Sequence, residues 1–116
     1  MLWRRSLAMK QKTSDLLSIC FKAGKAVKGF DSACEAAAKG RAKCILTACD
    51  ASAKTVKEAE FYCKKYGIPM MRTELTKDDI GAVCRKQIAV IGICDEGFCK
   101  GFAKILNKTP EDGGKE

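Results

Sequence analysis

Residues 24–50, GKAVKGFDSACEAAAKGRAKCILTACD, decide the fold because they lead from a glycine-bounded helix directly into an apolar strand. Ser32 and Glu35 have the spacing of a capping box, in which a hydroxyl and a carboxylate satisfy the free amides at a helix start. Gly40 supplies a residue that adopts the left-handed conformation at a helix end without a steric cost. We therefore predict a short helix that begins near Asp31 and is ended by Gly40.

Two continuous apolar runs, residues 44–49 and 88–93, mark the central strands of a sheet. A short run that is apolar throughout is typical of a strand covered by helices on both faces. Residues 26–28 and 68–71 fit shorter strands, and Pro69 is tolerated near the start or at an edge of such a strand. The sequence thus predicts a sheet of about four strands.

Capping residues and helical periodicity predict the remaining helices, which cover residues 15–23, 53–66, 77–83 and about 96–106. Because helices and strands alternate along the chain, crossover connections cover both faces of the sheet. We predict an α/β fold, a three-layer α/β/α sandwich with a small mixed sheet.

The 116 residues suffice for one domain, which we place at residues 14–106. Residues 1–13 carry basic but no acidic side chains, and we predict a basic flexible arm there. Residues 107–116 contain proline, glycines and acidic residues, and we predict a disordered tail.

The eight cysteines are predicted to be buried free thiols. No CxxC pair and no histidine is present to complete a zinc site, and no signal peptide points to an oxidising compartment. No stretch reaches the roughly 20 apolar residues of a membrane span. We expect a cytoplasmic protein with no metal, no other cofactor and no membrane association, and keep a cysteine-based redox or metal protein as an alternative.

The sequence offers no support for catalysis. It lacks histidine, GxSxG, the phosphate-loop pattern and a GxGxxG after a strand. The paired acids Asp78-Asp79 and Asp95-Glu96 stand where helix starts are predicted, so capping explains them. We predict that the protein is not an enzyme.

The charge of the chain favours a polyanionic partner. It has 22 Lys and Arg residues against 14 Asp and Glu residues, a formal net charge of +8. Such a field attracts nucleic acid or an anionic membrane surface, although a basic protein whose lysines only solvate it has the same composition. The residues that could contact such a partner lie mostly in the loop before residue 32 and in the loop before the last strand.

The sequence resembles a known family in four segments. These are GFDS at residues 29–32, KGRAK at 39–43, DAS at 50–52 and GICDEGF at 92–98. They are similar to the kink-turn-binding ribosomal-protein superfamily of the archaeal L-seven-Ae and eukaryotic L-thirty-e type, and within it to the YlxQ-like bacterial branch. The resemblance covers about residues 14–106.

The resemblance implies a non-catalytic, ribosome-associated protein that binds a sharply bent internal loop of RNA, a kink-turn, containing sheared G·A pairs. Members of the superfamily contact RNA from a glycine-led helix start and from the loop before the last strand. The matching positions and the neighbouring cations form the predicted RNA-binding set, Lys25, Lys28, Gly29, Phe30, Asp31, Ser32, Cys84, Arg85, Lys86 and Gln87.

The first of these segments departs from the archaeal Gly-x-Asn-Glu pattern. Asp31 replaces an amide that both donates and accepts, Ser32 is shorter than glutamate, and Glu35 is negative where that pattern has a lysine. Gly29 and the helix-start amides are kept, and these position phosphates without reading bases. A protein-interaction module that has lost RNA readout is therefore the alternative function. The sequence does not fix the oligomeric state, for which a monomer is the default.

Overall fold

The structure, a computed structural model, describes residues 2–106, with side chains from Lys10 onward. The predicted tail at residues 107–116 lies outside this range. The helices are α1 (Leu2–Lys22), α2 (Phe30–Ala38), α3 (Ala53–Tyr66), α4 (Lys77–Cys84) and α5 (Glu96–Leu106). The strands are β1 (Ala26–Lys28), β2 (Cys44–Thr47), β3 (Met70–Arg72) and β4 (Val90–Ile93).

The four strands form one mixed sheet in the order β1-β4-β2-β3. Strand β4 pairs antiparallel with both β1 and β2, whereas β2 and β3 are parallel. Residues of β2 and β4 are buried throughout, as the two continuous apolar runs predicted. The small mixed sheet of the predicted fold is confirmed.

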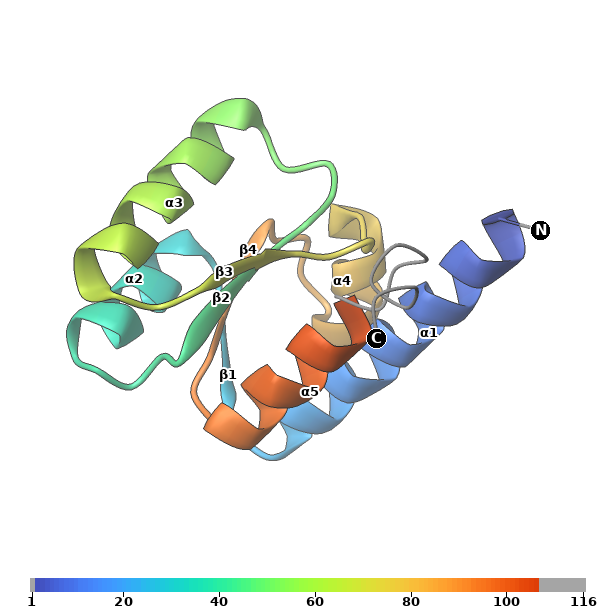
Figure 1. Cartoon of the computed structure of the whole chain (residues 1–116), viewed down its shortest axis with the longest axis horizontal. Coiled ribbons are helices and arrows are strands. Elements are labelled where there is room, and N and C mark those ends of the chain that lie inside the picture. The colour runs from blue at the N-terminus through green and yellow to red at the C-terminus, as the bar shows by residue number, and fades with distance from the viewer. Residues whose placement is uncertain (1, 107–116) are drawn as a thin grey trace, which may run out of the picture.

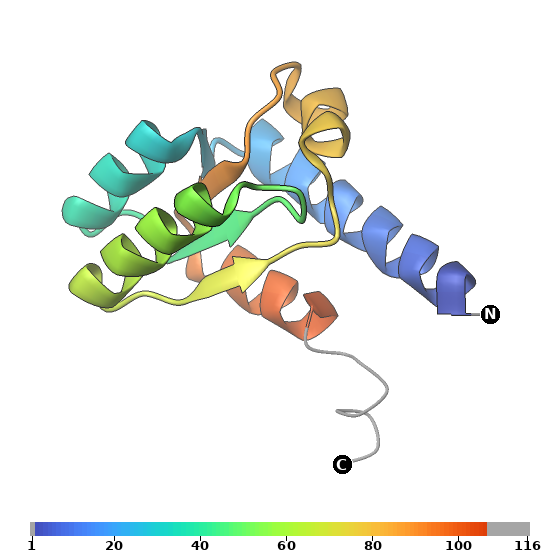
Figure 2. The same cartoon turned by 90° about the horizontal axis from the view of Figure 1, so that it is seen from above.

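Helices cover both faces of the sheet, with α2 and α3 on one side and α1, α4 and α5 on the other (Figures 1 and 2). The strands alternate accordingly: Cys44 and Leu46 belong to the core under α1, α4 and α5, and Ile45 belongs to the core under α2 and α3. This alternation follows from the two-residue period of a strand. The three predicted layers are therefore present.

Helix α2 lies close to the sheet because small residues meet at their contact. Its buried residues are all alanines, Ala33, Ala36 and Ala37. Gly92 of β4 lies under them, and a Cβ atom added there would come within 2.8 Å of Val27 Cγ2 and 3.2 Å of the Cα of Ala33. Larger residues at these positions would push α2 off β4.

The structure corrects one predicted helix start and one predicted cap. Helix α1 begins at Leu2, not at residue 15, so it includes residues 2–13, where a basic flexible arm was predicted. That segment contains good helix formers and no proline or glycine. Helix α2 begins at Phe30 on an N-cap at Gly29, and its N-cap has no side-chain hydrogen bond. The predicted capping box of Ser32 and Glu35 is wrong, and Glu35 instead pairs with Lys39 at 3.1 Å.

Other predicted helix ends are confirmed. Gly67 ends α3 in the left-handed conformation, and Ser52 caps its start by accepting the backbone N–H of Thr55. Asp79 caps the start of α4, as predicted, and forms a capping box with Thr76. Across the part of the chain that the structure describes, no helix is both long and apolar enough to cross a bilayer.

Candidate nucleic-acid interface

One end of the sheet brings two distant segments of the chain together. Because β1 and β4 are antiparallel, the residues after β1 lie beside the residues before β4. The N–H of Gly29 donates to the carbonyl of Val90 at 2.9 Å. The ammonium of Lys28 donates to the carbonyl of Cys84 at 3.3 Å. We call the surface formed by residues 28–32 and 84–87 the α2–α4 surface.

The start of α2 presents backbone donors on this surface. Gly29 has φ 94° and ψ 158°, a conformation that is almost restricted to glycine. The first intrahelical bond runs from the N–H of Ala33 to the carbonyl of Gly29. The N–H groups of Phe30, Asp31 and Ser32 therefore have no partner within the helix. Such a group of amides, at the positive end of the helix dipole, attracts anions.

The segment after α4 presents cations on the same surface. Arg85 ends α4 in the left-handed conformation at φ 66°, and its N–H donates to the carbonyl of Gly81 at 2.7 Å. Arg85, Lys86 and Gln87 are all exposed. Gln87 is held by a hydrogen bond from its side-chain amide to the carboxylate of Asp78. The segment is thus fixed by its backbone and by Gln87, while its two cations face solvent.

Cys84 contributes to the surface through its backbone and not through its thiol. Its side chain is buried, and its Sγ atom lies 3.2 and 3.3 Å from the carbonyl oxygens of Ile80 and Lys86, either of which can accept its single proton. Its own carbonyl accepts the bond from Lys28. Cys84 therefore joins the two segments and orients Lys28.

A hollow beside this surface extends it toward α1. Its lining includes Lys22, Lys28 and Arg85 together with the ring of Phe21. The ammonium of Lys28 lies 6.0 Å from the centroid of the Phe21 ring. Three cations around one hollow make this part of the molecule attractive to phosphate groups.

Lys25 is the predicted residue that the structure separates from the others. Its carbonyl accepts the N–H of Cys94 at 2.7 Å, and the next residue, Ala26, pairs with Ile93. Lys25 therefore stands at the opposite end of β1, about 10 Å along the strand from Lys28. The sequence predicted the strand at residues 26–28, but not its antiparallel pairing with β4, and that pairing decides which of the two lysines lies beside residues 84–87.

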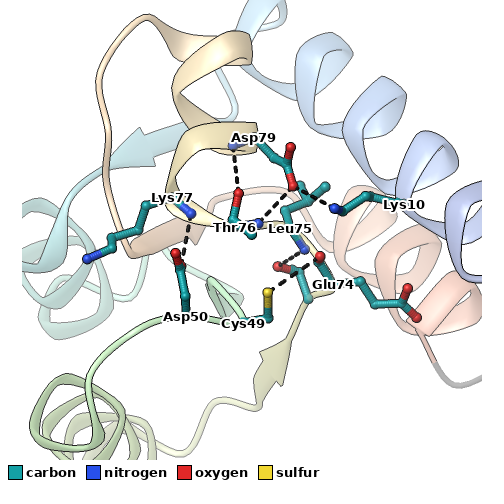
Figure 3. A network of polar contacts seen from close by, with 9 residues as sticks. Lys10, Cys49, Asp50, Glu74, Leu75, Thr76, Lys77 and Asp79 are labelled. Atoms are coloured by element: carbon teal, nitrogen blue, oxygen red, sulfur yellow. Dashed lines mark hydrogen bonds and ion pairs between the residues drawn. The ribbon is translucent and has the colours of Figure 1, made fainter.

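The sequence-based set also missed residues of the neighbouring loop after β2. The carboxylate of Asp50 accepts the backbone N–H of Lys77 at 2.9 Å (Figure 3), and Arg72 of β3 donates to the carbonyl of Cys49 at 3.1 Å. These residues lie at the same end of the sheet, because β2 and β3 are parallel and end side by side. The sequence did contain a sign that this loop matters, because the DAS segment at residues 50–52 is one of the four segments that resemble the family.

The start of α4 is fixed by a polar network that reaches α1 (Figure 3). The carboxylate of Asp79 accepts the backbone N–H of Thr76 at 3.0 Å and pairs with the ammonium of Lys10 at 3.0 Å. The N–H of Thr76 and the ammonium of Lys10 lower the pKa of Asp79. The hydrogen bond to Asp79 raises the pKa of Lys10. Helix α1 thereby helps to hold the helix that carries the second half of the α2–α4 surface.

Metal chemistry finds no support in this part of the molecule. Within residues 10–106, no group of three or more His, Cys, Asp and Glu side chains is placed to hold a metal ion. The α2–α4 surface itself presents backbone donors, cationic side chains and the carboxylate of Asp31.

Comparisons with solved structures identify the fold. A protein of unknown function from Bacillus halodurans superposes with a TM-score of 0.76 at 24% identity, covering 82% of this chain and 96% of that one. A 15.5kD RNA binding protein from Giardia lamblia superposes with a TM-score of 0.69 at 18% identity, covering 90% of each chain. Both share the α/β architecture described above.

Comparisons of sequence extend the likeness to the family. The RNA-binding protein YlxQ from Enterococcus faecium is 29% identical over 97 residues, which cover 84% of this chain and 93% of that protein. Large ribosomal subunit protein eL30 from Aeropyrum pernix is 32% identical over 92 residues, which cover 78% and 88%. The family profile matches residues 11–102. The resemblance noted in the sequence is confirmed, and the chain belongs to the ribosomal protein L7Ae/L30e/S12e/Gadd45 family.

Proposed function

We propose that this protein binds structured RNA through the α2–α4 surface and recognises a kink-turn-like internal loop, as a ribosome-associated protein without catalytic activity. The observation that carries the proposal is the bond from Lys28 to the carbonyl of Cys84, because it joins a helix start rich in donors to a segment rich in cations. The family relatives named as an RNA-binding protein and as a ribosomal protein support the same direction.

The two parts of the surface suit two kinds of phosphate contact. Exposed Lys28, Arg85 and Lys86 neutralise phosphate charge and release counterions. The free amides at the start of α2 bind a phosphate at short range without reading a base. Together they grip a backbone that is bent enough to meet both at once, which is the reason to propose a kinked RNA and not a straight duplex.

Base recognition at the start of α2 depends on Asp31 and Ser32, which are both exposed. The Asp31 carboxylate accepts hydrogen bonds, so it suits the amino group of a guanine in a G·A pair. The neighbouring negative charge of Glu35 is offset by its ion pair with Lys39. We propose that Asp31 reads a guanine and that the cations supply most of the affinity.

The test compares two RNAs and two pairs of variants. A kink-turn RNA and a duplex of the same length without the internal loop are titrated with the protein at several salt concentrations. Lys28→Ala with Lys86→Ala should weaken binding to both RNAs and reduce the slope of log affinity against log salt by about 1.5. Lys25→Ala with Lys64→Ala removes the same charge away from the surface and serves as the matched control.

Each result decides one part of the proposal. Tighter binding of the kink-turn RNA that is lost in Asp31→Ala supports base recognition. Equal affinity for the two RNAs at one salt concentration rejects kink-turn recognition. Equal losses in the two pairs of lysine variants reject the α2–α4 surface. If neither RNA binds while the protein copurifies with a stable protein partner, the interaction-module alternative replaces RNA binding.

A further inference from the structure

Two buried thiols meet in the core at the end of the sheet opposite to the α2–α4 surface. Cys44 begins β2 and is fully buried, and Cys99 lies in α5 with an exposure of 7%. Their Sγ atoms are 2.7 Å apart. A disulfide bond joins two sulfur atoms at about 2.05 Å, so roughly 0.7 Å of approach separates this pair from a bond.

A cavity gives small molecules a way to one of the two thiols. It has a volume of about 690 Å³, and Cys99 is part of its lining. Lys43 and Lys100 line the same cavity, together with Glu96. The two ammonium groups outnumber the carboxylate, so the cavity favours an anionic visitor. Cys44 is not part of the lining, which makes Cys99 the sulfur that a reagent meets first.

The chemistry of the pair also assigns the first step to Cys99. The hydrogen bond between the two thiols lowers the pKa of Cys99 and raises the pKa of Cys44, whose burial acts in the same direction. Other buried thiols differ: burial raises the pKa of Cys20 to about 12 and that of Cys63 to about 11. Because the thiolate is the reactive form, Cys20 and Cys63 are inert by comparison.

We propose that Cys44 and Cys99 are a redox-active pair that closes to a disulfide by exchange with a small anionic disulfide entering this cavity. The Cys99 thiolate attacks one sulfur of the small disulfide, which gives a mixed disulfide and one free small thiolate. Cys44, whose sulfur is held against that of Cys99, then attacks the Cys99 sulfur, gives up its proton and releases the second small thiolate. The two protein thiols lose two electrons and two protons, and the small disulfide is reduced to two thiols.

The bond would link the central strand β2 to α5 and close the chain between residues 44 and 99. A cross-link over so long a segment restricts the unfolded chain and stabilises the fold. The disulfide bond would also lie away from the proposed RNA contacts, since Cys44 is at the start of β2 and the α2–α4 surface is at the other end of the sheet. Oxidation is therefore expected to change stability and leave RNA affinity unchanged.

The experiment treats the full chain with glutathione disulfide and maps the bonds by mass spectrometry of unreduced tryptic peptides. Trypsin leaves Cys44 with Cys49 in one peptide and Cys94 with Cys99 in another. The variant Cys49→Ser with Cys94→Ser therefore makes the assignment unique. We expect a linked pair of peptides, an intact mass lower by two hydrogen atoms, and a melting temperature higher by about 5 °C or more than that of the reduced protein.

Controls distinguish the pair from general thiol oxidation. Cys99→Ala and Cys44→Ala should each abolish both the linked peptide and the rise in melting temperature, whereas Cys20→Ala should retain both. Circular dichroism checks that each variant is folded, and fragmentation spectra of the wild-type peptides test the same bond without any substitution. Mixed disulfides at other cysteines with no Cys44–Cys99 link, in the wild type and in the double serine variant, would overturn the proposal.

Discussion

Helices α2 and α4 frame the same end of the molecule, but they begin in opposite ways. Helix α2 starts on Gly29 with no side-chain cap, and the segment before it is held by a backbone bond to Val90. Helix α4 starts on a complete capping box of Thr76 and Asp79, reinforced by Lys10. One helix leaves its first amides available to a ligand, whereas the other uses its first amides within the protein.

The difference separates binding from stability within one short stretch of surface. A cap contributes to folding by satisfying donors, so an uncapped start gives up stability and keeps donors for another molecule. Helix α4 instead uses its first donors for stability, and its fixed start holds the segment that carries Arg85 and Lys86. Substitutions at the two starts should therefore have different signatures.

The largest expected effect is that of Gly29→Ala. A Cβ atom would meet nothing within 4 Å, so the cost is conformational and comes from φ 94°. We expect the free energy of unfolding to fall by about 1–3 kcal/mol in urea titrations. RNA affinity should fall as well, because the first turn of α2 shifts.

The control for this change is Gly97→Ala at the start of α5, where φ is not positive. Alanine there should be neutral or stabilising, since glycine lowers helix stability by roughly 0.5–1 kcal/mol relative to alanine. Equal losses at Gly29 and Gly97 would show that the conformation of Gly29 has no special role.

Thr76→Ala should have an intermediate effect at the start of α4. It removes the hydroxyl that accepts the N–H of Asp79, and the loss of such a cap costs about 1 kcal/mol of stability. RNA affinity, measured well below the unfolding temperature, should stay close to that of the wild type. A variant with wild-type stability and weak RNA binding would contradict the division between the two helix starts.

A smaller effect is expected from acid. The pKa of Asp79 is lowered in the folded protein, so its contribution to stability is complete above the unfolded pKa of about 3.9 and is lost as the pH falls through the folded value. The stability advantage of the wild type over Asp79→Asn should thus shrink below about pH 4. Chemical unfolding at several pH values measures this, and a constant difference down to pH 2 would be inconsistent with it.

The smallest effect should come from Ser32→Ala. The N-cap of α2 is Gly29 and has no side-chain hydrogen bond, so the hydroxyl of Ser32 is not needed to cap the helix. We expect a change of less than about 0.5 kcal/mol in the free energy of unfolding. A loss near 1 kcal/mol would instead indicate that a Ser32 capping box forms in solution.

The sequence predicted those parts of the fold that depend on local patterns. Residues close in sequence determine the apolar runs of β2 and β4 and the caps of α3 and α4, and the structure contains these features. The cap of α2 was wrongly assigned because the Ser32–Glu35 spacing matches a capping box, whereas the helix starts on Gly29 with no side-chain cap. The apolar periodicity of the sequence carries no information about the backbone conformation of Gly29.

Non-local contacts account for the other differences. Residues 2–13 lack an apolar stripe, so periodicity did not extend the predicted helix toward residue 2, and the ion pair from Lys10 to Asp79 joins residues that are far apart in the sequence. Likewise, the opposite positions of Lys25 and Lys28 follow from the pairing of β1 with β4. The bond between Lys28 and Cys84, which joins the two halves of the candidate surface, is equally invisible to a local pattern.

The close packing of α2 on Gly92 has a consequence for how a ligand is met. Both halves of the α2–α4 surface continue directly into that contact, one through the first turn of α2 and the other through β4. The contact has no room for an added methyl group, and we expect such close packing to keep helix and strand fixed relative to each other. The surface is therefore already organised before a ligand arrives, and association is expected to be limited by diffusion and charge steering, with any bending left to the partner.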